Sequence, residues 1–171
     1  VVFRLLKNVI MKIAKVFHKR YYWDHQQPQA IIMLPVRQIN GQVVTLDVRG
    51  FFVDPKLQEL QAFKWLRYIA WNDISECIRD NIASQPEVPG QDFWQFPHET
   101  LTTRKGDCED KAILLANLLR MLGVEDWKVR LNAGETSFGP HVWVTYFHNG
   151  SWQILDPSLE GASYRDIWFS W

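Results

Sequence analysis

A nearly continuous run of apolar residues extends from Lys111 to Leu122 and is followed by a glycine. The apolar members of this run include Ala112, Ile113, Leu115, Ala116, Leu118, Leu119 and Leu122. A run of this length, with Gly123 as a natural C-terminal stop, predicts a helix that is buried on most of its sides. The residues just before the run therefore lie at the N-terminus of a core helix, and their side chains determine the chemistry of that end.

The stretch Gly106-Asp107-Cys108-Glu109-Asp110 sets the start of this helix. Gly106 breaks regular structure, Asp107 is a favoured N-cap residue, and Asp110 stands where a capping-box partner belongs. Cys108 then falls in the first turn, where free N–H groups and the helix dipole favour a thiolate. The charges of Asp107 and Glu109 act against this, because they raise the pKa of a thiol. A reactive Cys108 therefore needs a base, and the base needs a group that orients it.

Two candidate strands joined by an Asn-Gly turn supply both groups. The first strand runs from His141 to Phe147 and the second from Trp152 to Asp156. Asn-Gly at positions 149 and 150 is a strong signal for a two-residue hairpin loop. With these two residues in the loop, His141 and Asp156 become diagonal neighbours on one face of the sheet. A shift of one residue would separate them, so the favoured turn predicts that base and carboxylate meet.

The order Gly-Asp-Cys-Glu-Asp, His-Val-Trp-Val and Leu-Asp-Pro resembles the transglutaminase-like (papain-like) superfamily. The segment from Trp94 to Leu101 is also similar to the stretch before the cysteine in bacterial, archaeal and phage members. The resemblance covers about residues 92–158 and implies an α+β fold, with a cysteine-bearing helix packed on an antiparallel β-sheet. It also implies a catalytic triad of Cys108 as nucleophile, His141 as general base and Asp156 as the orienting carboxylate.

This triad implies acyl transfer through a thioester on a peptide or amide bond of a protein or peptide substrate. If water resolves the thioester, the enzyme is a cysteine peptidase or amidase, and if an amine does, it is a transglutaminase. We expect hydrolysis, because small bacterial-type members resemble proteases more often and the chain has none of the extra domains of animal cross-linking enzymes. A non-catalytic interaction domain that retains the fold is the alternative from another class.

The same chemistry requires a group that stabilises an oxyanion. The backbone N–H of Cys108 is one candidate. The side chains of Trp94 and Gln95 are the other, because family members commonly supply a side chain from the segment before the cysteine. Spacing does not choose between them, and for Trp94 packing is the simpler role.

The acidic residues Asp107, Glu109 and Asp110 raise the question of a metal. They resemble the residues with which calcium-dependent periplasmic proteases that release biofilm adhesins hold Ca²⁺, and three carboxylates can supply part of an oxygen cage. Helix capping and pairing with the helix dipole explain the same residues without any metal. The sequence thus requires no cofactor and leaves calcium as an alternative.

The first twenty residues form a basic amphipathic pattern. No acidic residue precedes Asp24, although the whole chain of 171 residues has a net charge of zero. We expect residues 1–23 to form a basic helix and residues 24–171 a transglutaminase-like catalytic domain. The helix either docks its apolar face on that domain or contacts an anionic membrane surface or a partner protein. The neutral total gives no reason to expect nucleic-acid binding.

The remaining segments give weaker signals. Strands are predicted over 31–36 and 43–53, joined through Asn-Gly at 40–41, and one long helix from Asp54-Pro55 to about Ala83. Cys77 lies in the apolar stripe of that helix and is expected to be a buried, inert thiol. Residues 84–104 and 133–140 are predicted to be loops beside the site, with a strand over 127–132 between them. No apolar run is long enough to span a membrane, and because the chain begins at Val1 we expect any targeting segment to have been removed.

Overall fold

The computed structural model of the chain describes residues 36–39, 42–85 and 93–171. The chain divides between residues 33 and 34 into two units, and all described residues belong to the second. The predicted basic helix over residues 1–23 and most of the predicted strand over 31–36 therefore lie outside the described residues.

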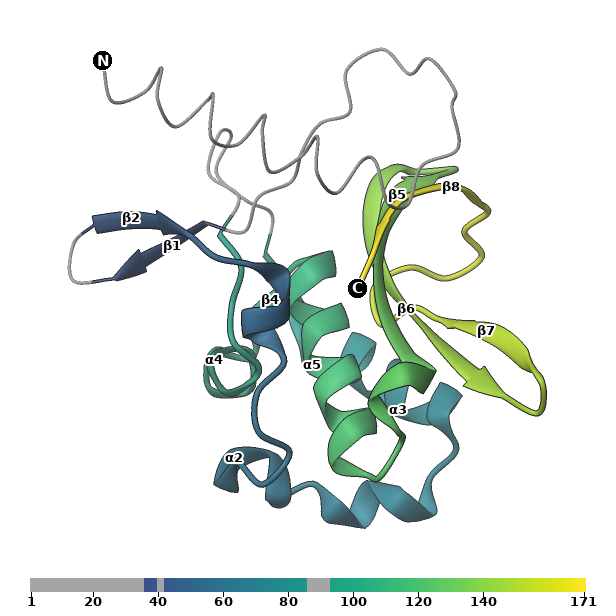
Figure 1. The fold of residues 1–171 in the computed structure, drawn as a ribbon, viewed down its shortest axis with the longest axis horizontal. Helices are drawn as coiled ribbons and strands as arrows, with labels where there is room; N and C mark the ends of the chain where they lie inside the picture. Colours follow the sequence, from purple (N-terminus) through teal and green to yellow (C-terminus); the bar gives the residue numbers. More distant parts are fainter. Residues whose placement is uncertain (1–35, 40–41, 86–92) are drawn as a thin grey trace. The chain divides into compact units, whose positions relative to one another are not determined.

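A four-stranded antiparallel sheet forms one layer of the domain (Figure 1). Its strands are β5 (Val129–Thr136), β6 (Gly139–His148), β7 (Ser151–Leu155) and β8 (Tyr164–Ser170), in the spatial order β7-β6-β5-β8. His148 pairs with Ser151, so Asn149 and Gly150 are the two loop residues, with φ values of 50° and 82°. These positive angles are those that a type I′ turn requires, and the predicted register of this hairpin is confirmed.

The loop that the sequence predicted over residues 133–140 is wrong, because β5 and β6 run on to a tight turn at residues 137–138. Gly134 suggested a loop but lies inside β5. A Cβ atom there would come within 2.0 Å of the Asp166 carbonyl oxygen and 2.8 Å of the Trp143 ring. The glycine therefore allows β8 and Trp143 to approach β5 closely and does not mark a loop.

Helix α5 (Cys108–Met121) lies against the sheet at β5 and β6 on one side and contacts α2, α3 and α4 on others (Figure 1). Its residues from Glu109 to Leu119 are all buried. The helix is thus buried on most of its sides, as the apolar run predicted, and the burial extends to three charged residues before the first alanine. The helix ends as expected at Gly123, whose φ is +98°. Gly123 and Val124 donate backbone hydrogen bonds to Arg120 and Leu119, each 3.0 Å long, which closes a Schellman motif. The α+β fold class is confirmed.

The long helix predicted from Asp54 to Ala83 is wrong, because the structure breaks it into three pieces. These are α2 (Gln58–Gln61), the 3₁₀-helix η2 (Lys64–Tyr68) and α3 (Trp71–Asn81). The apolar positions 57, 60, 63, 66 and 69 recur every three residues, which is the 3₁₀ repeat and not the α repeat. The spacing of four that suits α3 begins later, with Ile74, Ile78 and Ile82.

The segments around these helices are short. β1 (Val36–Ile39) and β2 (Gln42–Thr45) pair as a hairpin, but η1 (Val48–Phe51) is a 3₁₀-helix where a strand to residue 53 was expected. The carboxylate of Asp47 caps it by accepting the N–H of Arg49 at 2.9 Å. β3 (Ala83–Ser84) pairs in parallel with β4 (Lys105–Gly106), which leads into α5. The predicted loop over 84–104 contains α4 (Pro97–Thr103), and strand β5 follows η3 (Asp126–Lys128).

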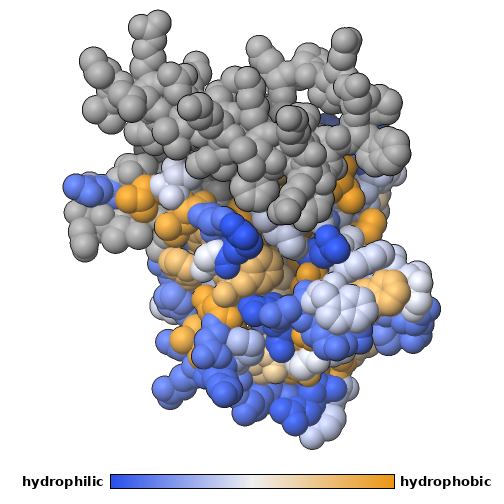
Figure 2. Space-filling view, viewed as in Figure 1, coloured by the Kyte–Doolittle hydropathy of each residue, from blue (hydrophilic) through white to orange (hydrophobic). Residues whose placement is uncertain are grey.

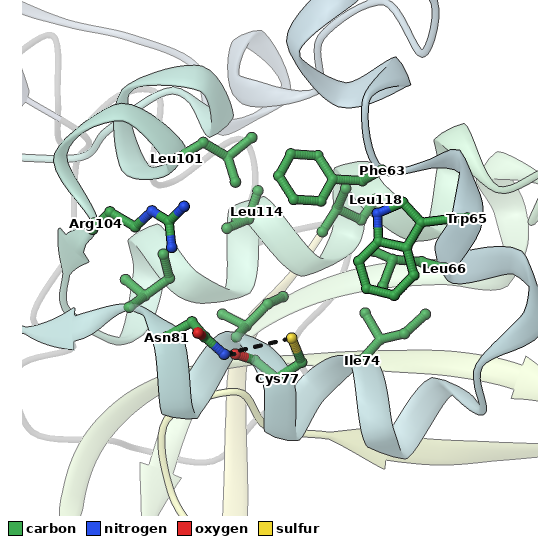
Figure 3. A pocket seen from close by; sticks show the side chains of 12 residues that line it. Phe63, Trp65, Leu66, Ile74, Cys77, Asn81, Leu101, Arg104, Leu114 and Leu118 are labelled. Carbon is green, nitrogen blue, oxygen red and sulfur yellow. Dashed lines mark hydrogen bonds between the residues drawn. The ribbon is translucent and has the colours of Figure 1, made fainter.

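The expectation that Cys77 is buried is wrong. The residue is exposed on α3, at the edge of an apolar groove of about 310 Å³ between α3, η2, α4 and α5. Figure 3 shows its sulfur on one side of the groove, with Trp65 and Arg104 at opposite ends. The amide of Asn81 lies 3.6 Å from this sulfur.

The surface of the described part mixes apolar and hydrophilic side chains on the face that Figure 2 shows. Among the described residues, no helix has the length and apolar character that a membrane span needs.

Candidate active site

The N-terminus of α5 carries Cys108 as its first residue, with Asp107 as the N-cap. The predicted capping box is not completed, because the Asp107 side chain makes no cap hydrogen bond. The carboxylate of Asp110 accepts the backbone N–H of Asp107, which is the other half of the box. It also accepts the backbone N–H of Gln95 at 2.7 Å and its side-chain amide at 2.5 Å. A Cβ at position 106 would lie 2.6 Å from that of Asp110, so Gly106 allows β4 to turn tightly into the helix.

The thiol of Cys108 is half-buried and donates a hydrogen bond of 3.2 Å to Glu109 Oε2. Burial and the negative charge of Glu109 raise the pKa of this thiol well above its usual value. A backbone hydrogen bond from Val142 acts in the opposite direction. Because Val142 follows His141 in β6, the sulfur lies against the strand that carries the predicted base. The thiol rather than the thiolate is thus favoured when the site is at rest.

His141 and Asp156 come together as the hairpin register predicted. His141 is buried in β6, and its Nε2 lies 2.7 Å from Oδ2 of Asp156, just after β7. With Nε2 donating to the carboxylate, Nδ1 of the neutral ring is the nitrogen that can accept a proton. This is the arrangement of a base whose tautomer is fixed by a carboxylate.

Asp156 accepts hydrogen bonds on both carboxylate oxygens. Oδ2 also accepts the hydroxyl of Tyr164 at 2.7 Å, and Oδ1 accepts the backbone N–H groups of Ser158 and Leu159 at 2.8 and 2.9 Å. Burial works to raise the pKa of Asp156, but the hydrogen bond and charge of His141 outweigh it, aided by Leu159 and Tyr164. The net result is a pKa below the usual value, so this buried carboxylate stays ionised.

The carboxylates of Asp107, Glu109 and Asp110 form an acidic cluster in which one oxygen of each lies within 4.8 Å of the others. Glu109 and Asp110 are buried, and Oδ1 of Asp107 and Oε1 of Glu109 are buried without a hydrogen-bond partner among the described residues. Burial first, and then Asp107, raise the pKa of Glu109 well above normal and that of Asp110 to about 7. Such facing carboxylates are stable only with a shared proton or a cation between them.

Lys111 is a buried cation one turn after Cys108 in α5. Its Nζ donates to Ser84 Oγ of β3 at 3.0 Å. Burial lowers the pKa of Lys111. Asp107, Cys108 and Asp156 act against this shift, so the ammonium lies near both the acidic cluster and the triad.

Trp94 and Gln95, the predicted oxyanion candidates, lie before α4. Trp94 is fully buried, with its ring 5.8 Å from that of Phe51. The amide nitrogen of Gln95 donates to Asp110 and to the carbonyl of Lys105, at 2.5 and 3.2 Å. Both of its amide hydrogens are therefore engaged, and Gln95 connects the segment before the cysteine to the acidic cluster.

The sequence interpretation missed Tyr164 and Lys111. Tyr164 was given no part in the site, and Lys111 was only placed at the start of an apolar helix. For Lys111 a signal existed, because a lysine inside an otherwise buried run needs nearby negative charge. For Tyr164 no local signal existed, because the path of residues 157–163 brings it back to Asp156.

Comparison with known proteins points to one superfamily. The sequence profile of the transglutaminase-like superfamily matches residues 58–157, which is more than half of the chain. A search of curated proteins gave no match.

Among solved structures, calcium-bound LapG of Legionella pneumophila is similar, with a TM-score of 0.51, 17% identity, and coverage of 72% of this chain and 69% of LapG. A structure from Cytophaga hutchinsonii, titled as a candidate cysteine protease, gives a TM-score of 0.47 at 20% identity, with coverage of 70% of this chain and 46% of that chain. At these identities the likeness to LapG concerns the fold. The profile match, which includes Cys108, His141 and Asp156, shows that the chain belongs to the transglutaminase-like superfamily.

Proposed function

We propose that this protein is a cysteine-dependent hydrolase that cleaves peptide or amide bonds in a protein or peptide substrate. The observation that carries the proposal is the bond of 2.7 Å between His141 Nε2 and Asp156 Oδ2, on the strand against which the Cys108 sulfur lies. A buried histidine held in one tautomer beside a thiol is the arrangement that nucleophilic catalysis by cysteine needs. The alternatives are amine transfer and a binding domain without catalysis.

The chemistry would proceed in two steps. Because the pKa of the Cys108 thiol is raised, its proton has to pass to Nδ1 of His141 as the sulfur attacks the carbonyl carbon. The imidazolium is stabilised by Asp156 and returns the proton to the leaving amine, which leaves a thioester on Cys108. Water, deprotonated by His141, then releases the acid and restores the thiol. The free N–H of Cys108 at the start of α5 is the oxyanion donor that we favour.

The acidic cluster adds a proposal about a cofactor, namely that Asp107, Glu109 and Asp110 hold a calcium ion. The donor set fits, since each of the three residues offers a hard oxygen ligand within 4.8 Å of the others. One oxygen of Asp107 and one of Glu109 are also buried without a donor among the described residues. LapG, which shares the fold, has been solved with calcium bound. A bound cation would neutralise the carboxylate charge that faces the Cys108 thiol.

Calcium binding can be measured without any substrate. Isothermal titration of CaCl₂ into EGTA-stripped protein should give one site per chain, and Glu109→Gln should remove it. Asp80→Asn, an exposed aspartate on α3, is the matched control and should leave the heat signal intact. Equal signals from the wild type and from Glu109→Gln would exclude this cluster as the site.

The activity itself is tested with a peptide library derived from whole-cell digests, read by mass spectrometry for new N-termini. Wild-type protein with calcium should generate new termini that are absent with Cys108→Ala, His141→Ala or Asp156→Asn. New isopeptide cross-links in place of new termini would favour amine transfer. A library left unchanged, together with an iodoacetamide rate at Cys108 that is the same in His141→Ala, would favour a binding domain.

A further inference from the structure

Tyr164 is the first residue of β8, and its side chain contacts the carboxylate of Asp156, the residue that follows β7. Its hydroxyl donates to Asp156 Oδ2 at 2.7 Å, the same oxygen that faces His141 Nε2. The intervening residues fold back because Ser163 is tied to the turn between β5 and β6. Ser137 N–H donates to the Ser163 carbonyl at 2.8 Å, and Ser163 N–H donates to Ser137 Oγ at 3.1 Å. The position of Tyr164 is thus set by these two hydrogen bonds and by its pairing with Thr136 of β5.

The ring of Tyr164 also belongs to a row of aromatic side chains beside the base. It lies 4.9 Å from the ring of Trp143, which in turn stacks with His141 at 6.3 Å. Trp143 thus contacts both the imidazole and the tyrosine whose hydroxyl binds the carboxylate. A tyrosine that only filled this space would need its ring and not its hydroxyl.

We propose that Tyr164 is a positioning residue for the triad, whose hydroxyl holds Oδ2 of Asp156 in line with Nε2 of His141. The effect of this positioning on turnover rests on the hydrolase function proposed above. Without this bond Oδ2 would be held by His141 alone, since the backbone N–H groups of Ser158 and Leu159 bind Oδ1, and the bond to His141 would be less firmly directed. The acidity of Tyr164 agrees with this contact, because burial and Asp156 raise its pKa well above normal.

The charged and titratable groups around Asp156 are few among the described residues. His141 faces Oδ2 from β6, Tyr164 faces it from β8, and Lys111 of α5 lies close enough for its ammonium to be affected by the charge. The remaining contacts are backbone N–H groups, those of Ser158 and Leu159. Of the three side chains, only Tyr164 can lose its hydrogen bond without a change in charge or shape, by the substitution Tyr164→Phe.

The test compares Tyr164→Phe with Tyr146→Phe. Tyr146 is a buried tyrosine of β6 whose hydroxyl donates to Gln153 at 3.0 Å, away from Asp156, so it controls for the loss of any buried hydroxyl in this sheet. The first readout is the NMR resonance of the His141 Nε2 proton, followed with pH. Removing a hydrogen bond to the ionised form raises the pKa of a carboxylate. In Tyr164→Phe the His141 resonance should therefore shift, and as the pH is lowered it should be lost at a higher pH than in the wild type.

The second readout is hydrolysis by the two variants. Tyr164→Phe should lower kcat about ten- to a hundredfold with little change in KM, while Tyr146→Phe stays near the wild type. A His141 resonance with wild-type position and pH dependence in Tyr164→Phe would overturn the proposal, whatever happens to the melting temperature. Because the resonance needs no substrate, a protein that hydrolyses nothing still tests the positioning role, and the failure of the proposed function is seen separately.

Discussion

Asp156 and the acidic cluster Asp107, Glu109 and Asp110 belong to one candidate site, yet their surroundings are opposite. Asp156 receives four hydrogen bonds on its two oxygens, and its pKa lies below normal although it is buried. In the cluster, two buried oxygens have no donor among the described residues, and the pKa values of Glu109 and Asp110 are raised. Burial penalises the ionised form in both places.

The difference lies in what the fold supplies around each carboxylate. The hairpin and the returning strand β8 provide donors for Asp156, so that half of the site is complete within the chain. The N-terminus of α5 provides mainly other carboxylates, so that half is complete only with a proton or a cation. Substitutions and conditions should therefore act in opposite directions on the two halves.

The largest effect should come from Asp156→Asn. Whichever way the new amide faces, its nitrogen meets two donors that need an acceptor, either His141 with Tyr164 or the two backbone N–H groups. We expect the free energy of unfolding to fall by about 3 kcal/mol and hydrolysis by about a thousandfold or more. Urea unfolding and the peptide assay measure the two effects. Asp80→Asn should stay within about 0.5 kcal/mol of the wild type, and an equal loss there would show that the effect is not specific to Asp156.

Calcium should stabilise the protein by a similar amount. A ligand that binds only the folded state at a hundred times its Kd adds about 2.7 kcal/mol to the free energy of unfolding. For a chain of this size that raises Tm by roughly 5 to 10 °C. Differential scanning fluorimetry with CaCl₂, and with EGTA added afterwards, measures the shift. If Asp156→Asn still responds and Glu109→Gln does not, the gain belongs to the cluster, whereas an unchanged wild-type Tm would count against a cation site.

The depressed pKa of Asp156 predicts how its contribution changes with pH. A carboxylate with a lower pKa in the folded state adds stability above its unfolded pKa, and this is lost as pH falls through the folded value. The difference in unfolding free energy between the wild type and Asp156→Asn should thus be largest near neutral pH and shrink as pH falls toward 3. Urea titrations in EGTA at several pH values give this difference. A gap that widens in acid would contradict the assignment.

The contrast between the two halves also explains what the sequence could predict. The pairing of His141 with Asp156 followed from local turn chemistry, because Asn149-Gly150 fixes the register of the hairpin that carries both residues. Tyr164 could not be found in this way, since its place depends on how Ser163 is tied to Ser137. The position of the thiol in the first turn of α5 was predictable from Gly106 to Asp110.

Elsewhere the predictions were wrong where the tertiary structure decided the type of a helix or the exposure of a residue. The broken helix before residue 83 carried its signal in the three-residue spacing, which was taken for an α-helical stripe. Gly134 was taken for a loop residue, although its role is to let β8 approach. Cys77 lies on an apolar stripe but is exposed, because the stripe lines a groove as well as the core. The two hydrogen bonds that Gln95 donates to Asp110 join residues whose spacing in the sequence gives no sign of this contact.

The smallest effect should come from Glu109→Gln in calcium-free protein. It should be a gain in stability, whereas Asp156→Asn should cause a loss. The new amide keeps the shape of the side chain and is neutral without taking up a proton, whereas the carboxyl of Glu109 has its pKa raised well above normal by burial and by Asp107. Its N–H groups can donate to the buried Asp107 oxygen that has no donor among the described residues. We expect the free energy of unfolding in EGTA to rise by about 1 kcal/mol, measured by urea unfolding. An exchange of carboxylate for amide thus destabilises the protein at Asp156 and stabilises it at Glu109. A loss at both positions would show that Glu109 is held by its contact with the Cys108 thiol, and that the cluster is not short of donors.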